Sequence, residues 1–256
     1  MNPVRQSFNR AAASYDNAGT LQHQVATALT GLITSKLPAT FEGRLLDAGC
    51  GTGYCLAALG ESYPAAEFIG LDFAERMLQQ LPIAQRTLGI TADLQKLPIA
   101  ASTIGTYISS LAWQWCDPDR SAQEAFRILA PQGEFFIATL VTGTFQELAH
   151  SLEASGLNPG QHLLQCPSSA QIQSAVTAAG LEILDLSPTR ITTWHPDFRS
   201  LRHSIRGVGA NHLPSQITPP LNRQTRTRLI NAYEQLRTER GLPLSYDVLM
   251  IHARKR

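Results

Sequence analysis

Short apolar runs alternate along this chain with amphipathic segments, a pattern that predicts strands alternating with helices. Strands are predicted at 44–48, 67–72, 89–92, 106–110 and 134–140, and the helices between them at 54–62, 74–80 and 121–129. Pro131-Gln132-Gly133 is predicted to form the turn into the fifth strand. Because strands and helices alternate, we expect a parallel sheet with helices on both faces.

The segments before and after this alternation are mainly helical. Residues 3–37 carry apolar residues along one helical face and end before Pro38. Beyond Leu140 we expect helices at 144–154 and 169–179, a loop at 156–167, a sixth strand within 181–194 and a last strand at 246–253. We interpret 1–256 as a single domain with an N-terminal helical lid segment, 1–37, and a helical insertion, 196–241, between the last two strands. That insertion is expected to lie over the carboxyl ends of the strands, where open α/β sheets bind ligands.

Composition indicates an ordinary globular protein of 256 residues, 43% hydrophobic and 16% charged, which is enough chain for one sizeable core. No apolar run reaches the roughly 18 residues that a membrane span needs, and the first residues contain no apolar signal core. The four cysteines, Cys50, Cys55, Cys116 and Cys166, form no C-x-x-C pair and no metal-like cluster with histidine. We therefore expect a cytoplasmic protein with reduced thiols, no membrane contact and no metal site.

Charge is unevenly distributed, although the net charge is only +1. Residues 1–189 carry 9 Lys/Arg against 16 Asp/Glu, whereas residues 190–256 carry 12 against 4. The basic C-terminal quarter suggests an acidic partner or substrate, with a merely solvated basic surface as the alternative. Nucleic acid is disfavoured as that partner, because the region lacks aromatic residues interleaved with basic ones at stacking spacing.

The segment Leu45–Gly53 carries the clearest chemical signal. A predicted strand runs into D-x-G-x-G-x-G, with glycines at 49, 51 and 53, and glycine lets backbone approach a ligand closely. Dinucleotide loops need a last glycine where this chain has Tyr54, and no lysine follows as in triphosphate-binding loops. A ligand with an adenosine but no phosphate fits better, and we predict S-adenosylmethionine. A tight turn that binds nothing is the alternative.

The same motif resembles the first motif of class I S-adenosylmethionine-dependent methyltransferases. The resemblance implies a Rossmann-like α/β fold with a mostly parallel, seven-stranded sheet whose last two strands form a hairpin-like pair. Asp72 ends the second strand and is placed to accept hydrogen bonds from the ribose hydroxyls, with a helix N-cap as the alternative role. Asp47 is expected to hold the loop or to bind the ammonium group of the methionine part. The remaining cofactor-binding residues expected are Gly49, Cys50, Gly51 and Gly53 in the loop, Phe73 and Met77 against the adenine, Asp93 and Leu94 by resemblance, and Ser110 on the methionine side.

Four further segments narrow the resemblance. Ser7–Asp16, Leu111–Cys116, Thr139–Thr144 and Leu201–His212 resemble the malonyl-acyl-carrier-protein O-methyltransferases of biotin synthesis, and the likeness extends from Val4 to Arg254. It implies methylation of the free carboxylate of a malonyl thioester on acyl carrier protein or CoA, giving the ester that primes pimeloyl and biotin synthesis. The Trp113-Gln114-Trp115 sequence replaces the Asn/Asp-Pro-Pro-aromatic pattern of N-methyltransferases, which argues against methylation of nitrogen.

The residues expected to handle the acceptor are Tyr15, Arg202 and Arg206. Arg202 and Arg206 share a helical face, so one is expected to hold the substrate carboxylate while the other meets phosphopantetheine or the acidic carrier protein. Tyr15 is expected to close over the site, with packing against the sheet edge as its alternative role, and Arg10 in the same segment is expected to contact the cofactor. Three other functions stay open: methylation of another small acid or ring carbon, a non-catalytic S-adenosylmethionine-binding regulator, and a dinucleotide oxidoreductase.

Overall fold

A seven-stranded sheet forms the centre of the computed structural model, which describes residues 3–12, 20–81, 87–207 and 221–256. Its strand order is β3-β2-β1-β4-β5-β7-β6. The first five strands run parallel, and β7 runs antiparallel to both of its neighbours. Their bounds are β1 Arg44–Ala48, β2 Glu67–Asp72, β3 Thr87–Thr91, β4 Ile104–Ser110, β5 Leu129–Leu140, β6 Leu181–His195 and β7 Leu242–Lys255. The predicted α/β class, with its mostly parallel seven-stranded sheet, is confirmed.

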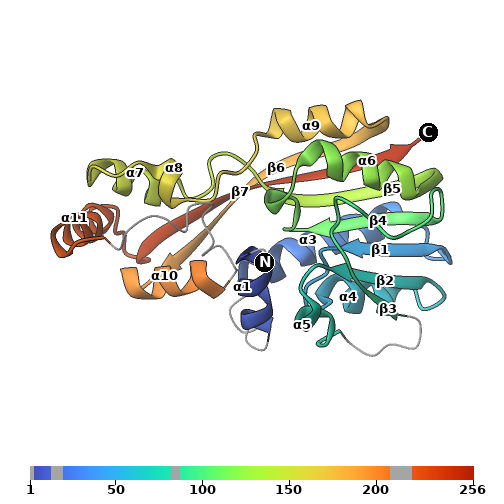
Figure 1. The fold of residues 1–256 in the computed structure, drawn as a ribbon, viewed down its shortest axis with the longest axis horizontal. Helices are drawn as coiled ribbons and strands as arrows, with labels where there is room; N and C mark the ends of the chain where they lie inside the picture. The colour runs from blue at the N-terminus through green and yellow to red at the C-terminus, as the bar shows by residue number, and fades with distance from the viewer. Residues whose placement is uncertain (1–2, 13–19, 82–86, 208–220) are drawn as a thin grey trace.

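Helices cover both faces of the sheet because successive residues of each buried strand point to opposite sides. Leu45 of β1 packs with α3 and α4, whereas its neighbour Leu46 packs with α6 and α9 on the other face. Figure 1 shows α6 and α9 together on one side of the sheet. The helices of this body are α1 Pro3–Ala11, α3 Thr20–Lys36, α4 Tyr54–Ser62, α5 Glu75–Leu78, α6 Pro118–Ile128 and α9 Ser169–Ala178, with a 3₁₀ turn, η2, at Trp113–Trp115.

The predicted bounds of β1, α4 and β2 agree with the structure, and those of several other elements differ. The helical segment expected over 3–37 contains two helices, α1 and α3, and residues 13–19 between them lie outside the described residues. The turn expected at 131–133 is wrong, because these residues lie within β5. The proline, glutamine and glycine form a bulge within the strand instead. The partners of β4 change from Leu129, opposite Ile104, to Glu134, opposite Thr106, and Gln132 has a φ of 62°. The loop expected at 156–167 contains a short helix, α8 Pro159–His162.

The β6–β7 hairpin extends well past the parallel strands. β5 pairs with β7 only as far as Leu140 opposite Val248, whereas β6 and β7 stay paired to His195 opposite Leu242. The cap consists of three helices beside this extension, α7 Gln146–Ala154, α10 Phe198–Gly207 and α11 Arg223–Glu234, and Figure 1 shows them at the end of the molecule away from β3. The cap and the sheet share one apolar cluster, in which Leu201 and Tyr233 are fully buried.

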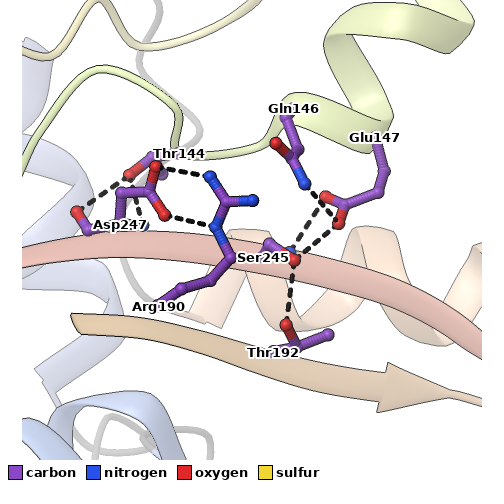
Figure 2. Close-up of polar contacts among 7 residues, drawn as sticks. All are labelled: Thr144, Gln146, Glu147, Arg190, Thr192, Ser245 and Asp247. Carbon is purple, nitrogen blue, oxygen red and sulfur yellow. Dashed lines mark hydrogen bonds and ion pairs between the residues drawn. The ribbon is translucent and has the colours of Figure 1, made fainter.

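Polar contacts brace the hairpin where it leaves the sheet (Figure 2). Arg190 of β6 donates two hydrogen bonds to the carboxylate of Asp247 on β7, at 2.6 and 2.8 Å. Glu147 of α7 accepts from both the N–H and the hydroxyl of Ser245, at 3.0 and 2.5 Å. Charged acceptors with several donors make strong hydrogen bonds, so these contacts fix α7 against the hairpin. Among the described residues, no helix is long and apolar enough to cross a membrane.

Candidate functional site

The glycine loop after β1 adopts a backbone that suits glycine. Gly49, Gly51 and Gly53 have φ angles of 83°, 55° and 88°, in the left-handed region. The N–H groups of Gly49 and Cys50 both donate to the carbonyl of Leu71 on β2, at 2.7 and 3.0 Å, which ties the loop to the neighbouring strand. A Cβ at position 49 would overlap the methyl group of Ala112. The loop therefore presents the backbone of its glycines toward the space above the strand ends.

Asp72 lies at the end of β2 and holds the loop from the other side. Its Oδ2 accepts from the N–H of Gly51 at 3.0 Å, and its Oδ1 accepts from the N–H of Ala74, the residue before α5, at 2.8 Å. Burial raises the pKa of this carboxyl to about 6, although these backbone hydrogen bonds pull it down. The alternative role as helix N-cap is wrong, because Ala74 is the N-cap of α5 and no side chain caps that helix. A carboxylate has about four lone-pair directions, so two remain for the ribose hydroxyls, and that contact stays a prediction.

An outer cavity opens on this side of the glycine loop, with an empty volume of about 740 Å³ that extends to solvent. The predicted cofactor residues that line it are Gly49, Gly51, Asp72, Phe73, Met77, Asp93, Leu94 and Ser110. The structure thus brings together side chains from four strand ends that are far apart in the sequence.

Residues that the sequence reasoning missed close the outer cavity. Val4 and Phe8 of α1 line it together with Trp115 of η2. The Phe8 ring makes edge-to-face contacts with Phe73 and Trp115, and the centroid distance is 5.8 Å in both cases. The signal available was the amphipathic pattern of the first helix, which needs a surface to cover. The N-terminal segment is therefore part of the cavity wall.

An inner cavity lies on the other side of the same loop. It is lined by Asp47, Gly49, Cys50, Gly51 and Ser110, all predicted, and by further residues that include Gln22 and His23 of α3. Within the described part of the chain, Asp47 Oδ1 and Gln22 Oε1 are buried and have no hydrogen-bond partner. Buried acceptors of this kind normally have a donor. The inner cavity is therefore suited to a cationic or N–H-bearing group.

Asp47 has the most perturbed carboxyl group of the site. Its side chain is 2% exposed, and burial, with a smaller contribution from the charge of Asp72, raises its pKa to about 7. A positive ligand beside it would restore the charged form. Gln22 was missed by the sequence reasoning, although a glutamine on the same helical stripe as Ala26 and Leu29 was a visible anomaly.

Gln114 fixes the end of β4 beneath the outer cavity. Its Nε2 donates to the carbonyl of Leu111 at 2.6 Å, and its Oε1 accepts from the hydroxyl of Thr139 on β5 at 3.1 Å. Leu111 lines the cavity with a φ of 52°, which is strained for a residue with a branched side chain. Gln114 therefore holds a strained backbone in place. Trp113 is fully buried and donates to the hydroxyl of Tyr107 at 3.2 Å, so its ring is part of the core.

Several predicted residues lie elsewhere or outside the described residues. Tyr15 is in the undescribed segment 13–19, and Arg206 is in the last turn of α10 with its side chain outside the described part. Arg202 lines a groove between α10 and α11, and the outer and inner cavities do not include it. Arg10 is exposed on α1 and Gly53 precedes α4, and both cavities are lined without them. Their roles stay predictions.

Comparisons with known proteins agree with this geometry. Residues 46–137 match the family model described as "Methyltransferase domain". The chain is 38% identical to the malonyl-[acyl-carrier protein] O-methyltransferase of Dechloromonas aromatica, covering 98% of this chain and 94% of that protein. It is 35% identical to the protein of the same name from Herminiimonas arsenicoxydans, covering 97% and 94%. A 34% identical relative, the biotin biosynthesis bifunctional protein BioHC of Cellvibrio japonicus, is covered over 48% of its length and matches 96% of this chain.

Solved structures show the same fold at low sequence identity. The YcgJ protein from Bacillus subtilis superposes with a TM-score of 0.62 at 17% identity, covering 90% of this chain and 99% of that one. A geranyl diphosphate methyltransferase in complex with SAM superposes with a TM-score of 0.55 at 14% identity, covering 90% and 85%. At these identities, the likeness concerns the fold.

Proposed function

The chain belongs to the malonyl-[acyl-carrier protein] O-methyltransferase family, and from this membership we propose how its site works. The enzyme transfers a methyl group from S-adenosylmethionine to the free carboxylate of a malonyl thioester. The methyl ester produced serves biotin synthesis, the process named for one of its relatives. The observation that carries the assignment of the site is the pair of cavities at the glycine loop, because the lining of one suits a nucleoside and the lining of the other suits an amino acid.

The outer cavity fits the adenosine part of S-adenosylmethionine. Phe73 and Met77 provide apolar surface for the adenine, and Leu94 closes the far side. Asp72 is buried at the strand end and keeps two lone-pair directions for the ribose hydroxyls. Asp93 accepts from the N–H of Gln95 at 2.9 Å, which holds its turn at the cavity wall, where the family resemblance places the adenine amino group.

The inner cavity fits the methionine part. Asp47 and Gln22 are acceptors without a partner among the described residues, and the α-ammonium group of an amino acid is a donor with three N–H bonds. A buried carboxyl whose pKa is about 7 is stabilised in its charged form by such a group. These two side chains would therefore bind the ammonium and orient the methionine chain toward Ser110, which lines both cavities.

The chemistry needs alignment more than proton transfer. When bound, S-adenosylmethionine supplies an electrophilic methyl group on a positively charged sulfur. A malonyl carboxyl group, with a pKa near ~4, is already ionised at neutral pH, so the protein need not remove a proton. Positioning two bound reactants can contribute about 7–11 kcal/mol to lowering a barrier. The residues of this chain therefore bind, orient and exclude water, which is the role of the apolar wall from Phe8, Leu111 and Trp115.

The acceptor side rests on the expected roles of Tyr15, Arg202 and Arg206. Tyr15 would close over the malonyl group and donate to its carboxylate, and Arg206 would bind that carboxylate in bidentate fashion. Arg202 faces the groove between α10 and α11, which favours contact with the carrier protein rather than with the malonyl carboxylate for this residue.

All four cysteines are free thiols, which supports a cytoplasmic location as part of this proposal.

Labelled methyl transfer tests the function directly. The protein is incubated with S-adenosylmethionine carrying a radioactive methyl group and with malonyl-acyl carrier protein, with malonyl-CoA and acetyl-acyl carrier protein in parallel. We expect base-labile label on the malonyl group and none on the acetyl group, because only malonyl has a free carboxylate. Binding of S-adenosylmethionine without transfer to either malonyl thioester would contradict the proposal and indicate a regulator.

A further inference from the structure

The helices α10 and α11 present basic residues to solvent on one side and apolar residues to the core on the other. In α10, Phe198 and Leu201 are buried, whereas Arg199 and His203 are exposed four residues apart on one face. In α11, Leu229 is buried and Arg226 is exposed. The apolar positions explain why both helices pack on the β6–β7 hairpin. They do not explain why the outward positions are arginines.

A groove runs between the two helices, and its lining combines positive charge with apolar surface. It is lined by Phe198, Arg199, Ser200, Arg202, His203, Arg226 and Ile230, without an acidic residue. Arg199 and Arg226 form no ion pair with a described residue. Of the nearby acids, Glu234 pairs with Arg237 at 2.7 Å. Asp197 accepts from the N–H and hydroxyl of Ser200 and stays a carboxylate, whose pKa the neighbouring Arg199 helps to lower. Arg199 and Arg226 together outnumber this one carboxylate, so the groove keeps a net positive charge.

The groove has a rigid floor. The Phe198 ring packs on Tyr233 of α11 with centroids 5.4 Å apart. The Tyr233 hydroxyl in turn donates to the carbonyl of Pro243 on β7 at 2.7 Å. Both helices are thus joined to each other and to the hairpin. A surface held in this way does not have to be ordered when a partner binds, which saves the entropy of ordering it.

We infer that the groove between α10 and α11 is the docking surface for the acidic carrier protein that presents the malonyl group. This inference rests on the proposed function, because it takes the carrier protein as the bearer of the substrate. Acyl carrier proteins are acidic, so the charges are complementary, and an apolar floor within a basic rim matches the usual anatomy of a protein interface. Arg202 then belongs to this surface, and Arg206 is left for the substrate carboxylate.

Charge reversal at the rim tests the inference. The variants are Arg199→Glu, Arg226→Glu and the double variant, and each places a carboxylate in or next to the first turn of a helix, where the helix dipole favours it. Arg228→Glu is the matched control, because Arg228 is exposed on α11 and does not line the groove. Each protein is assayed with malonyl-acyl carrier protein and with a malonyl thioester of N-acetylcysteamine, which has neither protein nor phosphate.

For the double variant, we expect kcat/KM with malonyl-acyl carrier protein to fall roughly tenfold or more at low salt. The loss should shrink toward 0.5 M salt, because the Debye length falls below about 5 Å there. The small thioester should keep its kcat/KM, and Arg228→Glu should keep both. Binding of the carrier protein without its prosthetic group, measured by biolayer interferometry, should weaken in parallel.

Two results would overturn the docking surface. Unchanged kcat/KM with malonyl-acyl carrier protein in the double variant would show that the carrier docks elsewhere. An equal loss with both substrates would assign the groove to the acceptor site itself. A wild-type protein that methylates neither malonyl thioester would instead contradict the proposed function, so the two failures are distinguishable.

Discussion

Replacing Asp47 by asparagine would separate the two effects of one buried carboxyl group, on stability and on cofactor binding. Burial raises the pKa of Asp47 from 3.8 to about 7 in the folded protein. An acid whose folded pKa is raised keeps its proton in the folded state while the unfolded state loses it. The free energy of unfolding therefore falls as pH rises from about 4 to about 7, and the loss is complete above that range.

The size of the effect follows from the shift. A shift of about three pKa units, at 1.36 kcal/mol each, corresponds to roughly 4 kcal/mol at pH 8, of which less than half is already present at pH 5. The amide that replaces the carboxyl group cannot ionise, so Asp47→Asn should gain about 3 kcal/mol relative to wild type between pH 5 and pH 8. Comparing the two pH values removes contributions of the substitution that do not depend on pH.

Urea unfolding at pH 5 and pH 8, without S-adenosylmethionine, measures this difference. Glu153→Gln on α7 serves as the control, because that side chain is exposed to solvent. Calorimetric titration supplies the second half of the test: wild-type affinity for S-adenosylmethionine should rise between pH 6 and pH 7.5, whereas Asp47→Asn should bind more weakly and without that dependence. A stability difference that is the same at both pH values would refute the raised pKa. Equal affinity in both proteins would refute the contact with the ammonium group.

Three further substitutions test other parts of the structure. Gly49→Ala should abolish detectable binding of S-adenosylmethionine, because the added Cβ would overlap Ala112 and because position 49 has a φ of 83°. Gly60→Ala in α4 is the control, since a Cβ there meets nothing within 4 Å. Normal binding by Gly49→Ala would contradict the loop geometry. Gln114→Leu should lower the free energy of unfolding by about 1–3 kcal/mol and weaken S-adenosylmethionine binding, because the carbonyl of Leu111 loses its donor. Urea unfolding and calorimetric titration measure the two effects. A loss of stability with unchanged binding would show that the outer cavity does not depend on Gln114. Glu147→Ala should lower the free energy of unfolding by about 2–3 kcal/mol through the lost contacts with the hairpin, and an unchanged urea midpoint would show that α7 is held by apolar packing instead.

The sequence predicts the glycine loop and the residues around the outer cavity well, for physical reasons. Strand β1 and the glycines after it form a local pattern, in which a buried apolar run meets residues that only a tight turn needs. The residues Asp72 and Met77 could be placed because parallel strands end at one edge of the sheet. These inferences need only short-range periodicity and topology.

Other features depend on contacts that periodicity does not encode. The last strand was expected at 246–253, yet β7 begins at Leu242, because residues 242–245 pair with β6 along the hairpin extension although proline at 243 is unusual within a strand. The pattern of α10 could not tell which side chains face α11, so the position of Arg202 in the groove became visible only in three dimensions. Gln22 was overlooked because an unpaired amide oxygen is a property of its surroundings.

The long β6–β7 hairpin separates the molecule into a fixed body, formed by the sheet and the helices that cover it, and an exchangeable head, formed by the hairpin extension with α10 and α11. The residues between Arg190 and Asp247 extend past the sheet, and they join it through the paired strands β6 and β7, the braced junction and the apolar cluster that the cap shares with the sheet. Under the proposed function, changes in that head would alter which acceptor is received without disturbing the glycine loop expected to bind the methyl donor. A chimaera joined at this junction, with the head of another methyltransferase, would keep the donor site of this chain and take its acceptor from the other.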